Sequence, residues 1–202
     1  MGIMEIIGIA GSVSLLAGWR LYLTIFATGL AMRSGYVPFP EHLAALDVLG
    51  NPWVMGVAAI AAVMEFFADK VMWLDSAWDA IHTAVRPLGG ALLALAIVDP
   101  SDPATQVVAF LLGGGGALVA HGGKAGARAV INASPEPVSN VVTSTAEDVA
   151  SIGLLWLVYE YPLAAGAVAL VLLGLMIWLL LVARRALRRI FSFGKPQPPP
   201  PA

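Results

Sequence analysis

The sequence predicts an all-α, polytopic membrane helix bundle of about six spans, and three observations lead to this fold class. Hydrophobic residues make up 59% of the 202 positions and charged residues only 12%, whereas soluble domains carry about 25% charged residues. The mean hydropathy is +0.84. The apolar residues fall into runs of about 20, the length that a helix needs to cross a bilayer.

The apolar segments lie at 4–33, 52–70, 75–98, 104–131, 136–158 and 162–187. Three of them are interrupted: by Gly18 and Arg20 in the first, by "RPLGG" in the third and by "GGGG" in the fourth. Irregular backbone at membrane depth survives only where protein covers it or where it lines a wet cavity. We therefore predict broken helices facing the bundle interior, with continuous, bent helices as the alternative. The sixth segment reads as a simple lipid-facing anchor.

The predicted organisation is one transmembrane domain, 1–190, followed by a disordered, Pro-rich cytoplasmic tail, 191–202. Four arginines at 184, 185, 188 and 189 lie at the end of the last span or just after it, and basic residues next to a span favour the cytoplasmic side. Counting single crossings back along the chain places the N-terminus in the cytoplasm as well. No basic region precedes the first apolar run, so we expect no removable signal peptide.

Two groups of three spans suggest an internal repeat. Each half would begin with a glycine-broken helix and continue with a helix that carries an acidic pair, Glu65 with Asp69 and Glu147 with Asp148. Because each half contains an odd number of crossings, the two halves would be inverted. Inverted repeats are typical of transporters, whose binding site lies between the halves.

Charged and imidazole side chains recur at helical spacing within these apolar segments. They are Arg20 in the first; Glu65 and Asp69 in the second; Asp75, Asp79, His82 and Arg86 in the third; His121, Lys124 and Arg128 in the fourth; and Glu147 and Asp148 in the fifth. The spacing in the third and fourth segments places each set on one helix face. An unpaired charge at mid-bilayer costs about 2.5–3.5 kcal/mol. We therefore expect these groups to face inward and to pair.

The "RPLGG" break predicts an anion site. Pro87 suits the first turn of a new helix, and Gly89 and Gly90 leave its backbone uncovered. Free N–H groups at a helix start attract a carboxylate or phosphate. The predicted substrate-binding residues are Arg86, Pro87, Gly89, Gly90, His121, Lys124 and Arg128. The acids named above and His82, which titrates near neutral pH, would serve charge pairing or proton coupling.

These features favour a transporter or permease for a small anionic or phosphate-bearing solute or a lipid head group. Two alternatives stay open. Asp75, Asp79 and His82 could hold a divalent cation in a membrane-embedded phosphoryl-transfer enzyme, or the charges could only lock the helices of a non-catalytic scaffold. Cysteine is absent and the net charge is −2, so thiol chemistry is excluded and nucleic-acid binding is not indicated. We expect no cofactor, and the sequence leaves homo-oligomer formation open.

Several stretches resemble one family of bacterial membrane proteins. They are "LYLT" at 21–24, "EFFADK" at 65–70, "LDSAWDAIHTAVRPLGGA" at 74–91, "GGGGALVAHGGKAGARAVINASPEPVSN" at 113–140 and "AED" at 146–148. The family is known as domain of unknown function 4126. The resemblance implies a multi-pass protein of the bacterial inner membrane and supplies neither an activity nor a catalytic residue. Arg20 departs from it, since an uncharged residue is expected before "LYLT".

Overall fold

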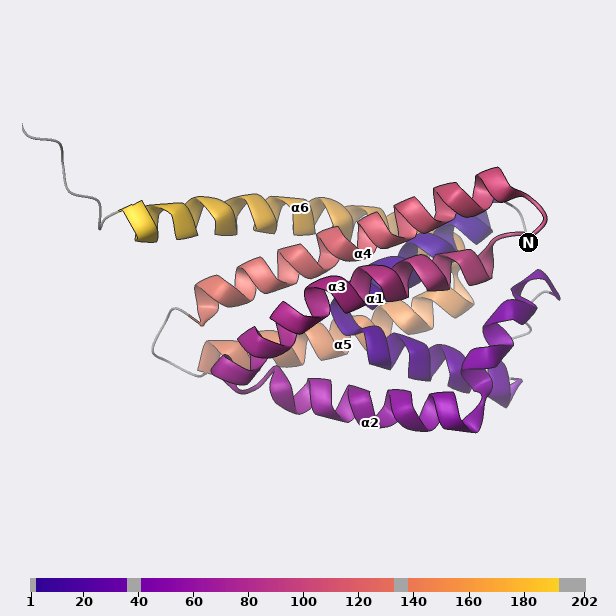
Figure 1. Cartoon of the computed structure of the whole chain (residues 1–202), viewed down its shortest axis with the longest axis horizontal. Coiled ribbons are helices and arrows are strands. Elements are labelled where there is room, and N and C mark those ends of the chain that lie inside the picture. Colours follow the sequence, from indigo (N-terminus) through magenta and orange to yellow (C-terminus); the bar gives the residue numbers. More distant parts are fainter. Residues whose placement is uncertain (1–2, 36–40, 133–137, 193–202) are drawn as a thin grey trace, which may run out of the picture.

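The computed structural model describes residues 3–35, 41–132 and 138–192, and these ranges are helical almost throughout. The elements are α1 (Ile3–Ser34), the 3₁₀ helix η1 (Glu41–Gly50), α2 (Pro52–Ala68), α3 (Met72–Ile97), α4 (Pro103–Ile131), α5 (Val138–Glu160) and α6 (Pro162–Ser192). They run roughly along the long axis of a single bundle (Figure 1). The predicted all-α fold is confirmed. The proposed tail from residue 193 onward lies outside the described residues.

Five of these helices are long and apolar enough to cross a membrane. The exception is α2, which is apolar but has 17 residues, a length of about 25 Å. Large apolar side chains such as Trp53, Leu111, Leu170 and Val171 are exposed on the bundle surface, where lipid would cover them. The chain is therefore an integral, multi-pass membrane protein.

Helix α1 is the innermost helix, and it bends back on itself at Arg20. The backbone there is not helical, with φ −142° and ψ 70°. In the first half of α1, Gly8 packs against Pro162 at the start of α6. In the second half, Thr28 shares a hydrogen bond with Tyr159 near the end of α5. Both halves thus lead away from the α5–α6 connection and meet at Arg20 (Figure 1).

This hairpin corrects the predicted course of segment 4–33. The segment does not cross once; it enters and leaves at the same end of the bundle. The first residues of α1 and the last residues of α6 consequently lie at opposite ends (Figure 1). The expectation that both termini share the cytoplasmic side does not fit this arrangement, because it was counted from a single crossing.

Helices α3 and α4 are continuous, so the breaks predicted at "RPLGG" and "GGGG" are wrong. Pro87 lies inside α3, and the four glycines lie inside α4. Two of the four glycines pack closely against α3 instead: a Cβ on Gly113 would lie 2.5 Å from the Cβ of Ala94, and one on Gly114 would lie 3.3 Å from the carbonyl oxygen of Pro87, whereas one on Gly115 or Gly116 would meet nothing within 4 Å. Small residues let membrane helices approach closely, and α3 and α4 form the most extensive helix pair of the bundle.

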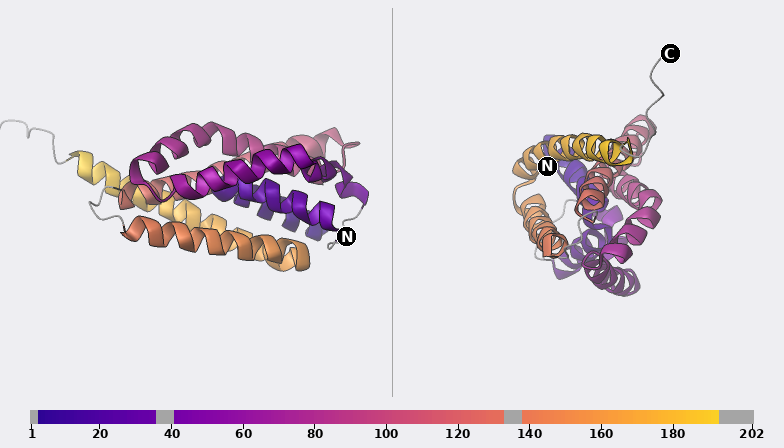
Figure 2. Two further views of the ribbon diagram at one scale, coloured as in Figure 1. Left: turned by 90° about the horizontal axis from the view of Figure 1, so that it is seen from below. Right: turned by 90° about the vertical axis from the view of Figure 1, so that its left-hand side faces the viewer.

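The proposed repeat required a broken helix at the start of each group of three spans. The structure shows a bend in α1, but α4 is continuous. The inverted repeat itself stays a prediction. Figure 2 shows the helices gathered around α1 when the bundle is viewed along its long axis. The core is built largely on the first half of α1, where Ile9, Val13, Leu16 and Ala17 are buried. This central position brings the bend at Arg20 into contact with α2, α4 and α5.

Candidate functional site

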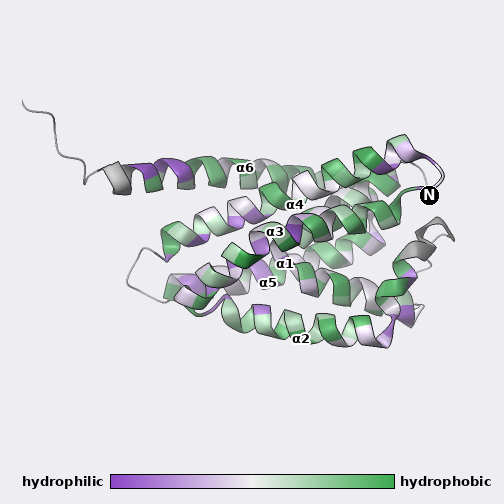
Figure 3. Cartoon of the chain, viewed as in Figure 1, coloured by the Kyte–Doolittle hydropathy of each residue, from purple (hydrophilic) through white to green (hydrophobic). Residues whose placement is uncertain are grey.

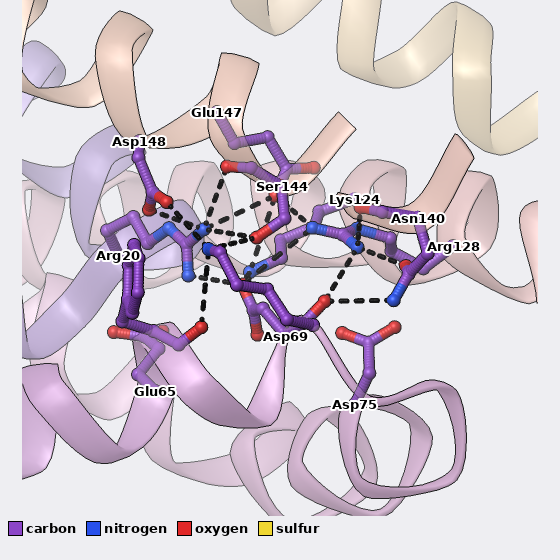
Figure 4. Close-up of polar contacts among 12 residues, drawn as sticks. Arg20, Glu65, Asp69, Asp75, Lys124, Arg128, Asn140, Ser144, Glu147 and Asp148 are labelled. Carbon is purple, nitrogen blue, oxygen red and sulfur yellow. Dashed lines mark hydrogen bonds and ion pairs between the residues drawn. The ribbon is translucent and has the colours of Figure 1, made fainter. Parts of the chain in front are cut away.

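The first of two charged clusters surrounds Asp69, at the point where the bend of α1 meets the end of α2. We call it the Asp69 cluster. Its members are Arg20, Asp69, Lys70, Lys124, Arg128, Asn140, Ser144, Glu147 and Asp148, most of which are labelled in Figure 4. They come from α1, the α2–α3 connection, α4 and α5. The cluster therefore joins parts of the chain that are far apart in sequence.

The carboxylate of Asp69 is the centre of this cluster. It forms an ion pair with Arg20, another with the Nζ of Lys124 at 2.8 Å and a longer contact with Arg128 at 3.9 Å. All four side chains are buried. The backbone carbonyl of Asp69 accepts further hydrogen bonds from Arg128 at 3.1 Å and from Asn140 at 3.0 Å. The end of α2 is thus fixed by both its carboxylate and its backbone.

The acidic pair of α5 closes the other side of the cluster. Asp148 pairs with Arg20 at 2.7 Å and with Lys70 at 3.2 Å, while Glu147 pairs with Arg128 at 2.8 Å. Glu147 retains 13% exposure and Asp148 17%, whereas Asp69 has none. The cluster holds four cations and three carboxylates, so it carries one surplus positive charge.

The second cluster surrounds Arg86 near the middle of α3, and we call it the Arg86 cluster. The guanidinium of Arg86 contacts Glu65 at 2.6 Å and Asp79 at 3.2 Å. It also donates to the Nδ1 of His121 at 2.8 Å. Because Nδ1 accepts this bond, the proton of a neutral His121 is on Nε2, which lies 3.1 Å from the backbone oxygen of Asp79. This cluster has two carboxylates for one cation, so the two clusters taken together hold five cations and five carboxylates.

The bend of α1 connects the two clusters. A helix end leaves carbonyl groups without intrahelical partners, and the first half of α1 ends at this bend. Arg86 donates to the carbonyl of Gly18 at 3.5 Å, and Lys124 donates to the carbonyl of Trp19 at 3.3 Å. Cations are favourable at the negative end of a helix dipole. One cation from each cluster therefore stabilises the same turn of backbone.

The remaining members of the predicted stripe on α3 take separate partners. Asp75 accepts a hydrogen bond from Asn132 at 2.8 Å. His82 lies 2.9 Å from the hydroxyl of Tyr22 and stacks on Trp78. Within the described ranges no group of three His, Asp or Glu side chains is placed to hold a metal ion. The arrangement thus gives the metal-site interpretation no support.

The predicted anion pocket is divided between the clusters. Arg86 and His121 belong to one cluster, and Lys124 and Arg128 belong to the other. Because α3 is continuous, no helix begins at Pro87, and the free N–H groups that the prediction required do not exist. Gly89 and Gly90 are packing positions, since a Cβ at each would lie 2.5 Å from Leu21 and Ala117, respectively.

The structure also adds residues that were not among the predicted site residues. Arg20 reaches Asp69 and Asp148 from the bend, and Lys70 extends the cluster toward solvent. Asn140 and Ser144 contact Arg128 and Lys70, respectively. The signals were present: Arg20 is a lone cation inside an apolar segment, and Asn140, Ser144 and Glu147 share one helix face. What was missing was the bend that brings Arg20 to them.

Comparison with known proteins identifies the family. A family model described as "Domain of unknown function (DUF4126)" matches residues 7–181, and the chain belongs to this family. No curated protein and no solved structure matches it. Both clusters and the bend of α1 lie inside the matched region.

Proposed function

We propose that the chain is a transporter or permease for a small anionic or phosphate-bearing solute or a lipid head group, with the Asp69 cluster as its binding site. The observation that carries this proposal is the cation surplus of the cluster at the tip of a hairpin within the membrane domain. Ionisable groups inside a membrane protein are costly, and they often belong to substrate or ion pathways. One bound monoanion would make the Asp69 cluster neutral.

The solute would enter from the side of α5. Glu147 and Asp148 are the least buried acids of the cluster, and both pair with arginines whose planar guanidinium suits carboxylate and phosphate. A solute oxygen that replaces one of these carboxylates keeps Arg20 or Arg128 paired. Asp69 would stay in place as the fixed counter-charge. The exchange thus avoids leaving a buried cation alone, which would be costly.

The hairpin of α1 supplies an element that can move. Discontinuous helices at membrane depth are characteristic of transporters, in which they form the substrate site. Arg20 at the tip of the hairpin contacts both the fixed acid Asp69 and the acid pair of α5. A shift of the hairpin would therefore change the pairing of Arg20 at the same moment as it changes access to the cluster.

A proposed orientation accompanies this function. The basic end of α6 favours the cytoplasm, which places the start of α1 and the α3–α4 connection on the opposite side. The chain has no native cysteine, so single cysteines can report the two sides. A cysteine at Ser101 should react with an impermeant thiol reagent in intact cells, and one at Ser192 should not. The reverse pattern contradicts the orientation.

A scaffold is the second candidate, and one observation favours it. Every cation of the two clusters already has a carboxylate partner in the chain. Such a closed network can fix helix positions without any solute. The two candidates differ in whether an added anion binds.

Thermal unfolding of the purified protein separates them, because a ligand that binds only the folded state raises its stability. The probes are inorganic phosphate, small carboxylates and glycerol phosphate. The proposal predicts that at least one raises the melting temperature of the wild type. Lys70→Gln, which removes the surplus charge at the exposed edge, should abolish this rise. The matched control is Arg33→Gln, the same charge change at the other end of the bundle, and it should preserve the rise.

If no anion raises the melting temperature, the scaffold is the better candidate. If an anion does, uptake of the same radiolabelled anion into vesicles containing the protein tests transport directly. Binding without uptake would contradict the transporter and leave a binding protein.

A further inference from the structure

The last helix continues well beyond the rest of the bundle. Helix α6 has 31 residues, a length of about 46 Å, whereas the hydrocarbon core of a bilayer is about 30 Å thick. Figure 1 shows its end extending past α4 and α5, and Figure 3 shows that this end changes from hydrophobic to hydrophilic. The final turns therefore leave the hydrocarbon layer.

Three arginines on these turns have no partner in the described part of the chain. The side chains of Arg184, Arg185 and Arg188 are exposed. None forms an ion pair within the described residues, whereas each cation of the two buried clusters has a carboxylate partner. Since the whole chain carries a net charge of −2, this local concentration of positive charge is not a general property of the protein.

The length of α6 indicates the depth of these arginines. The helix begins at Pro162, and about 20 residues are enough to cross the hydrocarbon layer, so the crossing ends at about residue 182. Arg184 and Arg185 follow within the next turn, and Arg188 lies one turn later. The guanidinium groups can therefore reach the phosphate layer.

Apolar side chains directly precede the arginines on the same exposed surface. Leu180, Leu181 and Val182 are exposed, and they would contact acyl chains. A lipid can thus satisfy both parts of this surface at once, with its chains on the apolar turns and its phosphate on the arginines. Free phosphate would contact only the basic part, so the geometry favours a phospholipid.

We propose that Arg184, Arg185 and Arg188 form a binding site for anionic phospholipids in the leaflet at this end of α6. Basic residues next to a membrane helix attract anionic head groups, and each contributes to the affinity. A guanidinium can also bind phosphate through two parallel hydrogen bonds. The site is separate from the Asp69 cluster and does not depend on a transport activity.

Fluorescence anisotropy tests this proposal with the full chain in a neutral detergent. The probe is phosphatidylglycerol with a fluorescent acyl chain, titrated with protein at low salt. The wild type should bind it more tightly than the matching phosphatidylcholine, and added salt should weaken the binding. The triple variant Arg184→Gln, Arg185→Gln, Arg188→Gln should bind the anionic probe on the order of a hundredfold more weakly.

Three further variants show which residues the binding depends on. Arg188→Gln should weaken binding about fivefold, while Arg33→Gln, the same change at the opposite end of the bundle, should leave it unchanged. Lys70→Gln should also leave it unchanged, which distinguishes this site from the proposed solute site. Wild-type affinity in the triple variant would overturn the proposal. So would equal affinity for phosphatidylcholine, or full competition by equimolar glycerol phosphate, which would indicate a site for free anions.

Discussion

The two ends of the bundle interior hold the same helices together in different ways. Toward the α2–α3 and α4–α5 connections, the contacts include the ion pairs of the Asp69 and Arg86 clusters, with Gly123 packed closely on Met176 beside them; we call this the charged half. Toward the α3–α4 and α5–α6 connections lies the glycine half, whose close contacts involve Gly8, Gly90, Gly113 and Gly166. Helices α3 and α4 pass through both halves, with charge on one stretch and small residues on the other.

This difference shows two solutions to one problem. Apolar burial does little to drive helices together in a membrane, because lipid is as apolar as a leucine side chain. In the glycine half, the close approach of the backbones gains dispersion energy. In the charged half, each charged side chain is stabilised by an oppositely charged partner. Close packing tolerates no added volume, whereas ion pairing tolerates no loss of a partner. The bend at Arg20 lies in the charged half, where Lys124 and Arg86 satisfy the carbonyls that it frees.

The largest effect is expected from Asp69→Asn, which removes the centre of the charged half. Arg20 and Lys124 would lose the carboxylate that they share, and breaking a buried pair costs about 3–5 kcal/mol. Chemical unfolding in mild detergent would measure this loss. Asp47→Asn, the same substitution at an exposed site on η1, is the control and should unfold like the wild type. Unchanged stability of Asp69→Asn would show that the cluster does not hold the charged half together.

The glycine half should respond to added volume. In Gly90→Ala the new Cβ would lie 2.5 Å from the Cβ of Ala117 and 3.0 Å from the carbonyl oxygen of Gly113. Overpacking of this kind costs about 1–3 kcal/mol.

The matched control for Gly90→Ala is Gly115→Ala, where a Cβ would meet nothing within 4 Å. The control should be neutral or stabilising by up to about 1 kcal/mol, since alanine favours helix more than glycine does. Adding Ala117→Gly to Gly90→Ala should restore part of the loss. Equal stability of the two alanine variants would refute the close contact.

Much of the charged half was predictable from the sequence, because the spacing of charged residues along one helix shows which of them share a face. Helical spacing placed Asp79 and Arg86 on one face, and the cost of bare charge in a membrane required partners. The partners themselves were not predictable, since they depend on which helices are neighbours. Arg86 and Lys124, predicted to share one pocket, pair with different carboxylates, Arg86 with Glu65 and Asp79 and Lys124 with Asp69.

The glycine half was misread, and the reason is physical. Glycine lowers helix stability and also permits close helix packing, so "GGGG" alone does not distinguish a break from a contact. In α4 the packing role prevails, because Gly113 faces α3. The break in α1 falls at Arg20, within the interruption predicted at Gly18 and Arg20, but the reversal of chain direction there was not predicted. The bend is stabilised by Asp69, Asp148 and Lys124, contacts that no local pattern reveals.

The edge of the charged half should behave differently from its centre. Lys70 is 20% exposed and pairs with Asp148 at 3.2 Å. Partly solvated pairs contribute at most about 1 kcal/mol, so Lys70→Gln should destabilise far less than Asp69→Asn. Adding salt should shrink the difference between Lys70→Gln and the wild type, since screening weakens the exposed pair. A loss as large as that of Asp69→Asn would mean that the cluster has no solvated edge.

The smallest effect is expected outside both halves, in the connection between α3 and α4. Asp102 caps α4 by accepting a hydrogen bond from the backbone N–H of Ala104 at 3.0 Å. The hydroxyl of Thr105 also donates to this carboxylate and, with the backbone N–H bonds, holds the pKa of Asp102 below its usual value. A lowered folded-state pKa stabilises the fold above the unfolded-state pKa, and that contribution is lost as the pH falls through the folded-state value.

Asp102→Asn tests this cap, because asparagine caps helices about as well as aspartate but does not titrate. The variant should resemble the wild type at neutral pH. As the pH falls below about 4, the wild type should lose the contribution of the charged cap while the variant does not. The melting temperature of the wild type minus that of the variant should therefore decrease with falling pH. A constant difference would show that the carboxylate of Asp102 has the same pKa in the folded and unfolded chain.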